Sequence, residues 1–132
     1  MMGESSYLAD PHVAVGLVAS DGGAAMLPLL IGLMKAKQYV MLGDRISAAD
    51  AEKLNLVTRV AADDAVLDEA LVLGERLAAL PAQALRATKI AMNMHLSRAA
   101  LGVLEYALAE EYTSFSTREF KERVAAFRGR KA

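Results

Sequence analysis

Two short strand-like segments constrain the fold, because they are too few to make a sheet of their own. Residues 13–18, Val-Ala-Val-Gly-Leu-Val, form a continuous apolar run that is typical of a strand buried on both faces. The second such segment comes only at residues 56–60. A lone pair of strands is marginally stable, and parallel strands need neighbours on both sides. We therefore expect the first half of the chain to be part of a sheet whose other strands lie outside it.

Helix signals dominate between these two segments. The apolar stretches 24–31 and 33–42 predict two helices, and Gly43 stands where a glycine commonly ends a helix. Ser47, followed three residues later by Asp50, resembles a capping box and predicts a short helix that ends near residue 54.

Beyond residue 63 the pattern predicts helices alone. Asp63 or Asp64 caps the first of them, and Pro81 serves as the first residue of the next. Ser97 is expected to cap a third helix, and the capping box Ser116-Thr-Arg-Glu119 opens the last. Their aligned apolar faces either pack together as a small bundle or form an interface between subunits.

Composition limits the class of the protein. The chain has 132 residues, enough for one ordinary domain, with 15 Lys+Arg against 16 Asp+Glu. This balance excludes a strongly basic nucleic-acid binder and an acidic tail. The absence of cysteine excludes disulfides, thiolate metal sites and a cysteine nucleophile, and it fits a cytoplasmic protein.

The chain is unusually apolar for its length. Hydrophobic residues make up 55% of it, aromatic ones only 5%, and the mean hydropathy is +0.26. The longest apolar run, residues 24–34, is too short for a membrane span, which takes about 20 residues. The first ten residues lack the basic and apolar segments of a secretory signal. There is more apolar surface here than one small core would use.

A series of sequence blocks resembles a known family. They begin with Asp10-Pro-His-Val-Ala-Val-Gly-Leu-Val-Ala-Ser-Asp-Gly-Gly23 and end with Val124-Ala-Ala-Phe127 before a basic terminus. Between these two lie Leu27-Pro28, Ile31-Gly32, Ala36-Lys37, Leu42-Gly-Asp-Arg-Ile-Ser-Ala48, Ala51 and Leu54-Asn-Leu-Val-Thr-Arg-Val60. In order and spacing the blocks resemble the enoyl-CoA hydratase/isomerase (crotonase) family, whose members are typically twice as long.

The resemblance implies the C-terminal half of such an enzyme. The expected fold class is α/β but mostly helical, with residues 1–62 as the end of a crotonase-like ββα spiral and residues 63–132 as a helical oligomerisation region. Family members form trimers that often pair into hexamers. The expected partners are therefore copies of this chain or a missing N-terminal half, with no nucleic acid and no membrane. The two N–H donors of the oxyanion hole, and the first catalytic Glu, would precede Met1.

His12 and Asp21 are the candidates for acid–base chemistry. By the resemblance, His12 replaces a carboxylate that follows a proline, and a histidine can give or take a proton near neutral pH. Asp21 lies near an additional catalytic acid of some members. The alternatives are a surface histidine and an Asp21 that caps the next helix. Gly22 and Gly23 resemble the turn beside the acyl-thioester pocket, and otherwise make a plain turn.

The C-terminus holds candidate contacts to coenzyme A. By the resemblance, Arg130 and Lys131 would hold its phosphates and Phe127 would pack near its adenine; the alternative is a solvated basic end that suits the helix dipole. No cofactor is expected beyond the coenzyme A of the substrate. No glycine-rich phosphate loop occurs, so the nucleotide of coenzyme A would not be bound by such a loop. No metal is expected either, and His95 has no second ligand at metal-binding spacing.

The function implied by the resemblance is hydration of a 2-enoyl-CoA, or a related enolate reaction in fatty-acid metabolism, by an enzyme of which this chain is a truncated form. Without the oxyanion hole, most of the electrostatic stabilisation of the enolate is missing, so catalysis by this chain alone stays open. The alternative is a non-catalytic oligomerisation module or one half of a split enzyme. Acyl chain length, and the choice between hydration and isomerisation, stay open as well.

Overall fold

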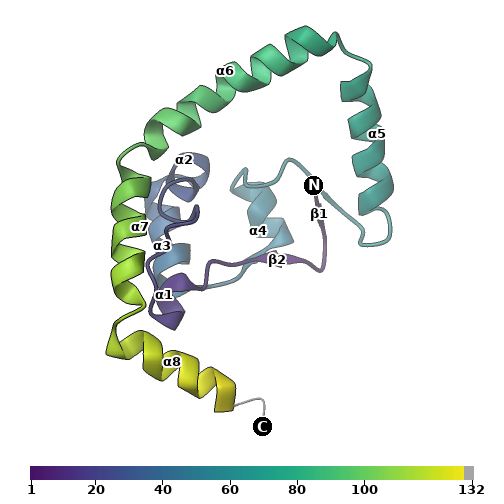
Figure 1. Ribbon diagram of the computed structural model, residues 1–132. Helices are drawn as coiled ribbons and strands as arrows, with labels where there is room; N and C mark the ends of the chain where they lie inside the picture. The colour runs from purple at the N-terminus through teal and green to yellow at the C-terminus, as the bar shows by residue number, and fades with distance from the viewer. Residues whose placement is uncertain (130–132) are drawn as a thin grey trace. The chain divides into compact units, whose positions relative to one another are not determined.

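Helices dominate the computed structural model, which describes residues 1–129 (Figure 1). The strands are Met2–Gly3 (β1), Tyr7–Leu8 (β2), Ile46–Ser47 (β3) and Val60–Ala61 (β4). The helices are His12–Val15 (α1), Leu27–Ile31 (α2), Leu33–Leu42 (α3), Ala48–Lys53 (α4), Val66–Ala78 (α5), Ala82–Ala100 (α6), Val103–Ser114 (α7) and Arg118–Gly129 (α8). None of the helices among these residues is long and apolar enough to cross a membrane.

Two compact units make up the chain. The first combines Met1–Leu8 with Ile46–Arg98, and the second combines Ala9–Arg45 with the chain from Ala99 onward. Each unit therefore takes residues from both sides of position 62, where the sequence predicts a division between spiral core and helical region. That division stays a prediction.

The first unit holds both pairs of strands. β1 pairs with β4 in parallel, and β2 pairs with β3 in antiparallel orientation. The buried residues around them are Met2, Ile46, Ala48, Ala51 and Ala61. Helix α5 has no buried residue, and neither has α6, and most of the apolar side chains of these two helices are exposed.

The second unit contains α1, α2, α3, α7 and α8. Its buried residues are mainly small: Ala19, Ser20, Ala25, Ala36, Val40, Ala107 and Ser114. Helix α1 packs against α3 and α8. A β-carbon on Gly16 would lie 3.1 Å from the backbone of Phe120, so the glycine lets α1 approach α8 closely.

The predicted strand at residues 13–18 is wrong. The chain forms one helical turn there, α1, which ends at Gly16 with φ 86° and ψ 23°. The backbone N–H of His12 donates a hydrogen bond of 3.1 Å to the carboxylate of Asp10, which helps to start the turn. A short apolar run does not distinguish a strand from a buried helix segment, and these local features decide for the helix.

The predicted strand at residues 56–60 is wrong for most of its length, because only Val60 lies in β4. Asn55 has φ 59°, a left-handed conformation that asparagine tolerates at the end of a helix. The N–H groups of Leu56 and Val57 then donate back to the carbonyl of Ala51, at 2.8 and 3.3 Å. The chain therefore turns here instead of continuing as a strand.

Two predicted helix caps are also wrong. Ser97 lies inside α6, where its hydroxyl donates to the carbonyl of Asn93 at 3.2 Å, a bond that a serine can make without ending a helix. Neither Asp63 nor Asp64 caps α5, because the residue at the cap position makes no side-chain hydrogen bond. The carboxylate of Asp63 instead accepts a hydrogen bond of 3.2 Å from the N–H of Ser5.

Other local predictions are confirmed, or the element begins up to three residues later than predicted, as α2 does. The two helices that follow residue 24 are α2 and α3, and Gly43 ends α3 in a left-handed conformation. Ser47 caps α4, where its hydroxyl oxygen accepts from the N–H of Asp50 at 3.1 Å. The cap of α8 is Thr117, one residue after the predicted Ser116, since Thr117 accepts from the N–H of Phe120 at 3.2 Å.

Candidate active site

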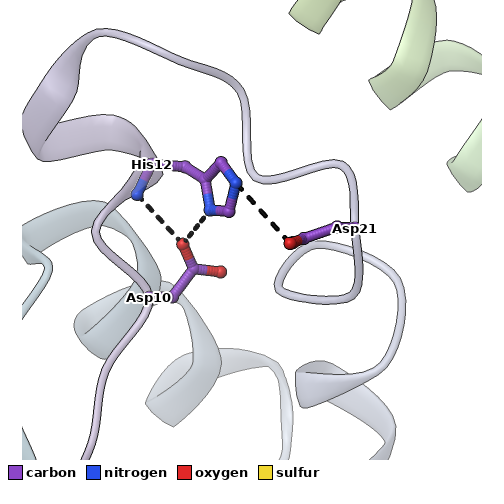
Figure 2. A group of neighbouring side chains, drawn as sticks. All are labelled: Asp10, His12 and Asp21. Carbon is purple, nitrogen blue, oxygen red and sulfur yellow. Dashed lines mark hydrogen bonds and ion pairs between the residues drawn. The ribbon is translucent and has the colours of Figure 1, made fainter.

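His12 is oriented by the residue two positions before it. The Oδ1 atom of Asp10 lies 2.7 Å from Nδ1 of the imidazole and 3.1 Å from the backbone nitrogen of His12 (Figure 2). A carboxylate only accepts hydrogen bonds, so Nδ1 carries the hydrogen and Nε2 is left to act on a substrate. Asp10 therefore sets both the orientation and the tautomer of His12.

Asp21 faces the other edge of the imidazole. Figure 2 shows the Nε2 atom turned towards Asp21, whose Oδ2 atom lies 3.7 Å away. The side chain of Asp21 is 71% exposed, against 21% for His12 and 11% for Asp10. These three residues, called the histidine cluster below, have one sheltered end and one end that is open to solvent.

Opposing effects act on the pKa of His12. Burial lowers this pKa, whereas the hydrogen bond with Asp10 and the negative charges of Asp10, Asp21 and Glu111 raise it. The carboxylates prevail, so the pKa of His12 lies above its ordinary value of 6.5. The protonated imidazole is therefore favoured over more of the neutral pH range than in a free histidine.

The glycine-rich turn makes room for Asp10. A β-carbon on Gly23 would lie 1.8 Å from Oδ2 of Asp10, a distance that no side chain can occupy. A β-carbon on Gly22, by contrast, would meet only the side chain of Met26, at 4.0 Å. Asp21 does not cap α2, which begins without a side-chain cap. The role of Gly22 and Gly23 beside an acyl thioester stays a prediction.

Asp10 and Glu111 were missed in the sequence, although both act on His12. Asp10 had a local signal, since an Asp two residues before another residue commonly accepts its backbone N–H. Glu111 had none, because α7 lies far along the chain from α1. Its link to the site runs through Ser20, whose hydroxyl donates a hydrogen bond to the Glu111 carboxylate.

Two of the cavities in the second unit involve residues of the predicted site. One, of about 440 Å³, is lined by Val15, Phe120, Arg123, Val124, Phe127 and Arg128. The other, of about 200 Å³, is mainly apolar and includes Gly23, Pro28, Leu33, Val40 and Met41 in its lining. Phe127 lines the first of these cavities, and its contact with coenzyme A stays a prediction, whereas Arg130 and Lys131 lie outside the described residues. His95 is exposed on α6.

The histidine cluster also has the composition of a metal site. One ligand atom from each of Asp10, His12 and Asp21 can be chosen so that all lie within 4.8 Å of one another. Two of the possible ligand atoms, Nδ1 of His12 and Oδ1 of Asp10, are already hydrogen-bonded to each other. Acid–base chemistry by the imidazole needs no change in this arrangement.

The entire sequence, residues 1–132, matches the family model described as enoyl-CoA hydratase/isomerase. The chain belongs to this family. A probable enoyl-CoA hydratase of Rhizobium meliloti (strain 1021) is 32% identical over 124 residues, which cover 94% of this chain and 48% of that protein. The chain spans about half the length of the relatives it matches.

Similar solved structures also match this chain over about half of their own length. An enoyl-CoA hydratase/isomerase from Mycobacterium paratuberculosis is similar with a TM-score of 0.88 and 47% identity, over 94% of this chain and 49% of that one. A β-diketone hydrolase from Anabaena sp. PCC 7120, bound to (S)-3-oxocyclohexyl acetic acid, has a TM-score of 0.81 and 27% identity, over 92% and 48%. The predicted fold class, a partial and mostly helical α/β crotonase-like fold, is confirmed.

Proposed function

We propose that the protein performs 2-enoyl-CoA hydration or a related enolate reaction of an acyl-CoA, with His12 as its proton-transfer group. The orientation of His12 carries the proposal: Nδ1 is bonded to Asp10 at 2.7 Å, and Nε2 faces the exposed Asp21. Family membership supports an acyl-CoA as the substrate class. The proposal needs no cofactor beyond the coenzyme A of the substrate, and it places the protein in the cytoplasm.

In the proposed reaction, His12 gives one proton and takes one. Hydration adds a hydroxyl group to C3 of the enoyl thioester and a proton to C2, by way of a state with enolate character. Neutral His12 accepts at Nε2 a proton from the water that adds to C3, and the protonated ring then donates this proton to C2 of the enolate, so the ring ends as it began. The raised pKa of His12 favours the proton donor, and Asp21 stabilises it.

The cavity of about 200 Å³ beside the glycine-rich turn is the proposed place of the acyl chain. Gly23 belongs to its lining and also touches Asp10, which orients His12. The other lining residues include Pro28, Leu33 and Met41, whose apolar side chains suit a hydrocarbon. An acyl chain in this cavity would bring its thioester to the turn that carries Asp21.

Coenzyme A is proposed to bind at the cavity of about 440 Å³ that includes Phe127. The ring of Phe127 offers an apolar face for the adenine, and Arg123 and Arg128 supply positive charge for phosphates. The cavity begins at Val15, on the same helical turn as His12. Arg130 and Lys131, which lie outside the described residues, are proposed to contact the phosphates as well.

A second candidate function is hydrolysis of a β-diketone, the activity in the name of the Anabaena neighbour. There water adds to one carbonyl, the bond to the central carbon breaks, and the enolate that leaves takes a proton. An imidazole held by a carboxylate, such as His12 on Asp10, suits the activation of water for such an attack. This reaction needs no coenzyme A, which distinguishes the two candidates.

The test is hydration of crotonyl-CoA, followed as the loss of absorbance of the conjugated thioester. The chain is assayed alone and together with the separately expressed N-terminal half of a related hydratase, and a cyclic β-diketone replaces crotonyl-CoA in a parallel assay. We expect turnover of crotonyl-CoA that falls about 100- to 10,000-fold in His12→Gln. Turnover of the diketone without turnover of crotonyl-CoA would favour the second candidate.

His95→Gln is the matched control, because it removes the other histidine of the chain from an exposed position on α6. Its activity should equal that of the parent chain. Equal activities of His12→Gln and the parent would contradict the role of His12. If crotonyl-CoA is neither turned over nor bound in calorimetry, that result would contradict the acyl-CoA proposal and favour an oligomerisation module.

A further inference from the structure

Ser20, which directly precedes Asp21, is a buried polar residue with a distant charged partner. It is 1% exposed, and its hydroxyl donates a hydrogen bond to Oε2 of Glu111 on α7. The partners are 91 positions apart in the sequence. Burying a hydroxyl is costly unless it is hydrogen-bonded, so the carboxylate of Glu111 is what makes the buried position of Ser20 stable.

Glu111 lies on the packed face of α7. Ala107, Glu111 and Ser114 follow one another at the spacing of a single helix face, and all other residues of α7 are exposed. Ala107 is 3% and Ser114 is 9% exposed. An acidic residue in the middle of such a stripe is unusual without a specific partner. Glu111 therefore differs from the solvated acidic residues on the rest of this helix.

The bond between Ser20 and Glu111 fixes the turn beside the histidine cluster. The N–H of Ser20 donates to the carbonyl of Val18 at 2.9 Å, so both its main chain and its side chain are tied. Asp21, by contrast, extends a mostly exposed side chain. An exposed carboxylate keeps its place only if the backbone that carries it is held.

We infer that Glu111 is a positioning residue: through Ser20 it holds the turn so that Asp21 faces Nε2 of His12. Glu111 also contributes a third negative charge to the surroundings of the imidazole, together with Asp10 before α1 and Asp21 on the turn. The effect on catalysis rests on the proposed function, whereas the positioning itself does not depend on it.

The experiment uses variants of the whole chain that separate the hydrogen bond from the charge. Ser20→Ala removes the hydroxyl donor, and Glu111→Asp shortens the side chain so that it no longer reaches Ser20; both keep the negative charge at position 111. Glu111→Gln keeps an acceptor for Ser20 but removes the charge. Glu110→Gln is the control, because it removes a charge from the adjacent, exposed position of α7. Amide hydrogen exchange and the NMR titration of His12 are the readouts.

The two readouts should respond differently. In Ser20→Ala and Glu111→Asp, exchange at the hydrogen-bonded amides of Ala24 and Met26 should rise about tenfold or more, because the turn is released. In Glu111→Gln the exchange should stay near that of the parent while the pKa of His12 falls. Glu110→Gln should change neither quantity.

Unchanged exchange in Ser20→Ala and Glu111→Asp would overturn the inference, and so would an equal fall of the His12 pKa in Glu110→Gln and Glu111→Gln. Circular dichroism identifies a variant that does not fold, in which case the remaining variants decide. If the NMR results are as expected, and the chain neither binds crotonyl-CoA nor hydrates it alone or with the N-terminal half, the inference stands and the proposed function fails. If both hold, Ser20→Ala should lower kcat about tenfold or more with little change in KM.

Discussion

The histidine cluster and the helices α5 and α6 differ in where their side chains find partners. Asp10 and His12 are bonded to each other, and Ser20 beside them is bonded to Glu111, all within the second unit. Helices α5 and α6 have no buried residues at all; Leu67 is 66% and Ile90 65% exposed. A helix with an apolar face is stable mainly through what that face packs against. The comparison indicates that contacts within this chain hold the histidine cluster, whereas the apolar faces of α5 and α6 are left uncovered by the described residues.

The cover of these faces is proposed to be another copy of the chain or the N-terminal half of the enzyme. The predicted role of the later helices in oligomerisation fits these exposed faces and stays a prediction. It also accounts for the high apolar fraction of 55%, which exceeds what the small cores of the two units use.

The largest expected effect tests whether the histidine cluster works as a unit. Asp10→Asn removes the carboxylate that orients His12, so kcat for crotonyl-CoA should fall about 100-fold, as expected for a misplaced catalytic group. Asp44→Asn, at an exposed position of the same unit, is the control and should leave kcat unchanged. Steady-state kinetics of both variants decide, and equal rates would show that Asp10 does not orient a catalytic group.

The next effect tests the other side of the comparison. Light scattering after size-exclusion chromatography should give a mass of several times 14.1 kDa for the parent chain. Leu67→Glu combined with Leu71→Glu places charges on the exposed apolar face of α5 and should reduce the mass to that of one chain. Glu75→Lys, on the same helix, should leave it unchanged. A parent chain that is already monomeric would contradict the interface.

Substitutions at two glycines, one in each region, compare how tightly the two regions are packed. Gly23→Ala should lower the free energy of unfolding by about 1–3 kcal/mol, because the new methyl group collides with Asp10. Gly74→Ala, inside α5, has no atom within 4 Å of its β-carbon and should raise this free energy by about 0.5–1 kcal/mol. Urea unfolding measures both, and effects of the same sign would show that the turn is not tightly packed.

The smallest effect concerns pH. Because the pKa of His12 is raised in the folded state, its ion pairs stabilise the fold fully below pH 6.5, and this contribution is lost as the pH rises through the raised value. The free energy of unfolding should therefore fall over that interval in the parent but not in His12→Gln. An NMR titration of Asp10→Asn should show a lower His12 pKa, and an unchanged one would contradict the assigned cause.

Some local sequence signals predicted local structure correctly, and others did not. The cap at Ser47 and the end of α3 at Gly43 depend on bonds between residues a few positions apart, so they could be read directly from the sequence. The strand expected at residues 13–18 is wrong, because a short apolar run has only a weak preference for a strand. The hydrogen bond that Asp10 accepts and the left-handed Gly16 favour a helical turn instead. The helix cap expected at Ser97 is also wrong, because α6 continues past this residue.

The features of the candidate site also fall into two groups, those that the sequence predicted and those that only the structure revealed. The sequence by itself determined the family blocks, the two candidates His12 and Asp21, and the glycine that leaves space for a neighbour. Only the tertiary structure decided that Asp10 orients the imidazole, that Nε2 faces Asp21, and that Glu111 reaches the turn from α7. The physical reason is that caps and turns depend on neighbours along the chain, whereas the charge around a histidine depends on every carboxylate that folding brings close to it.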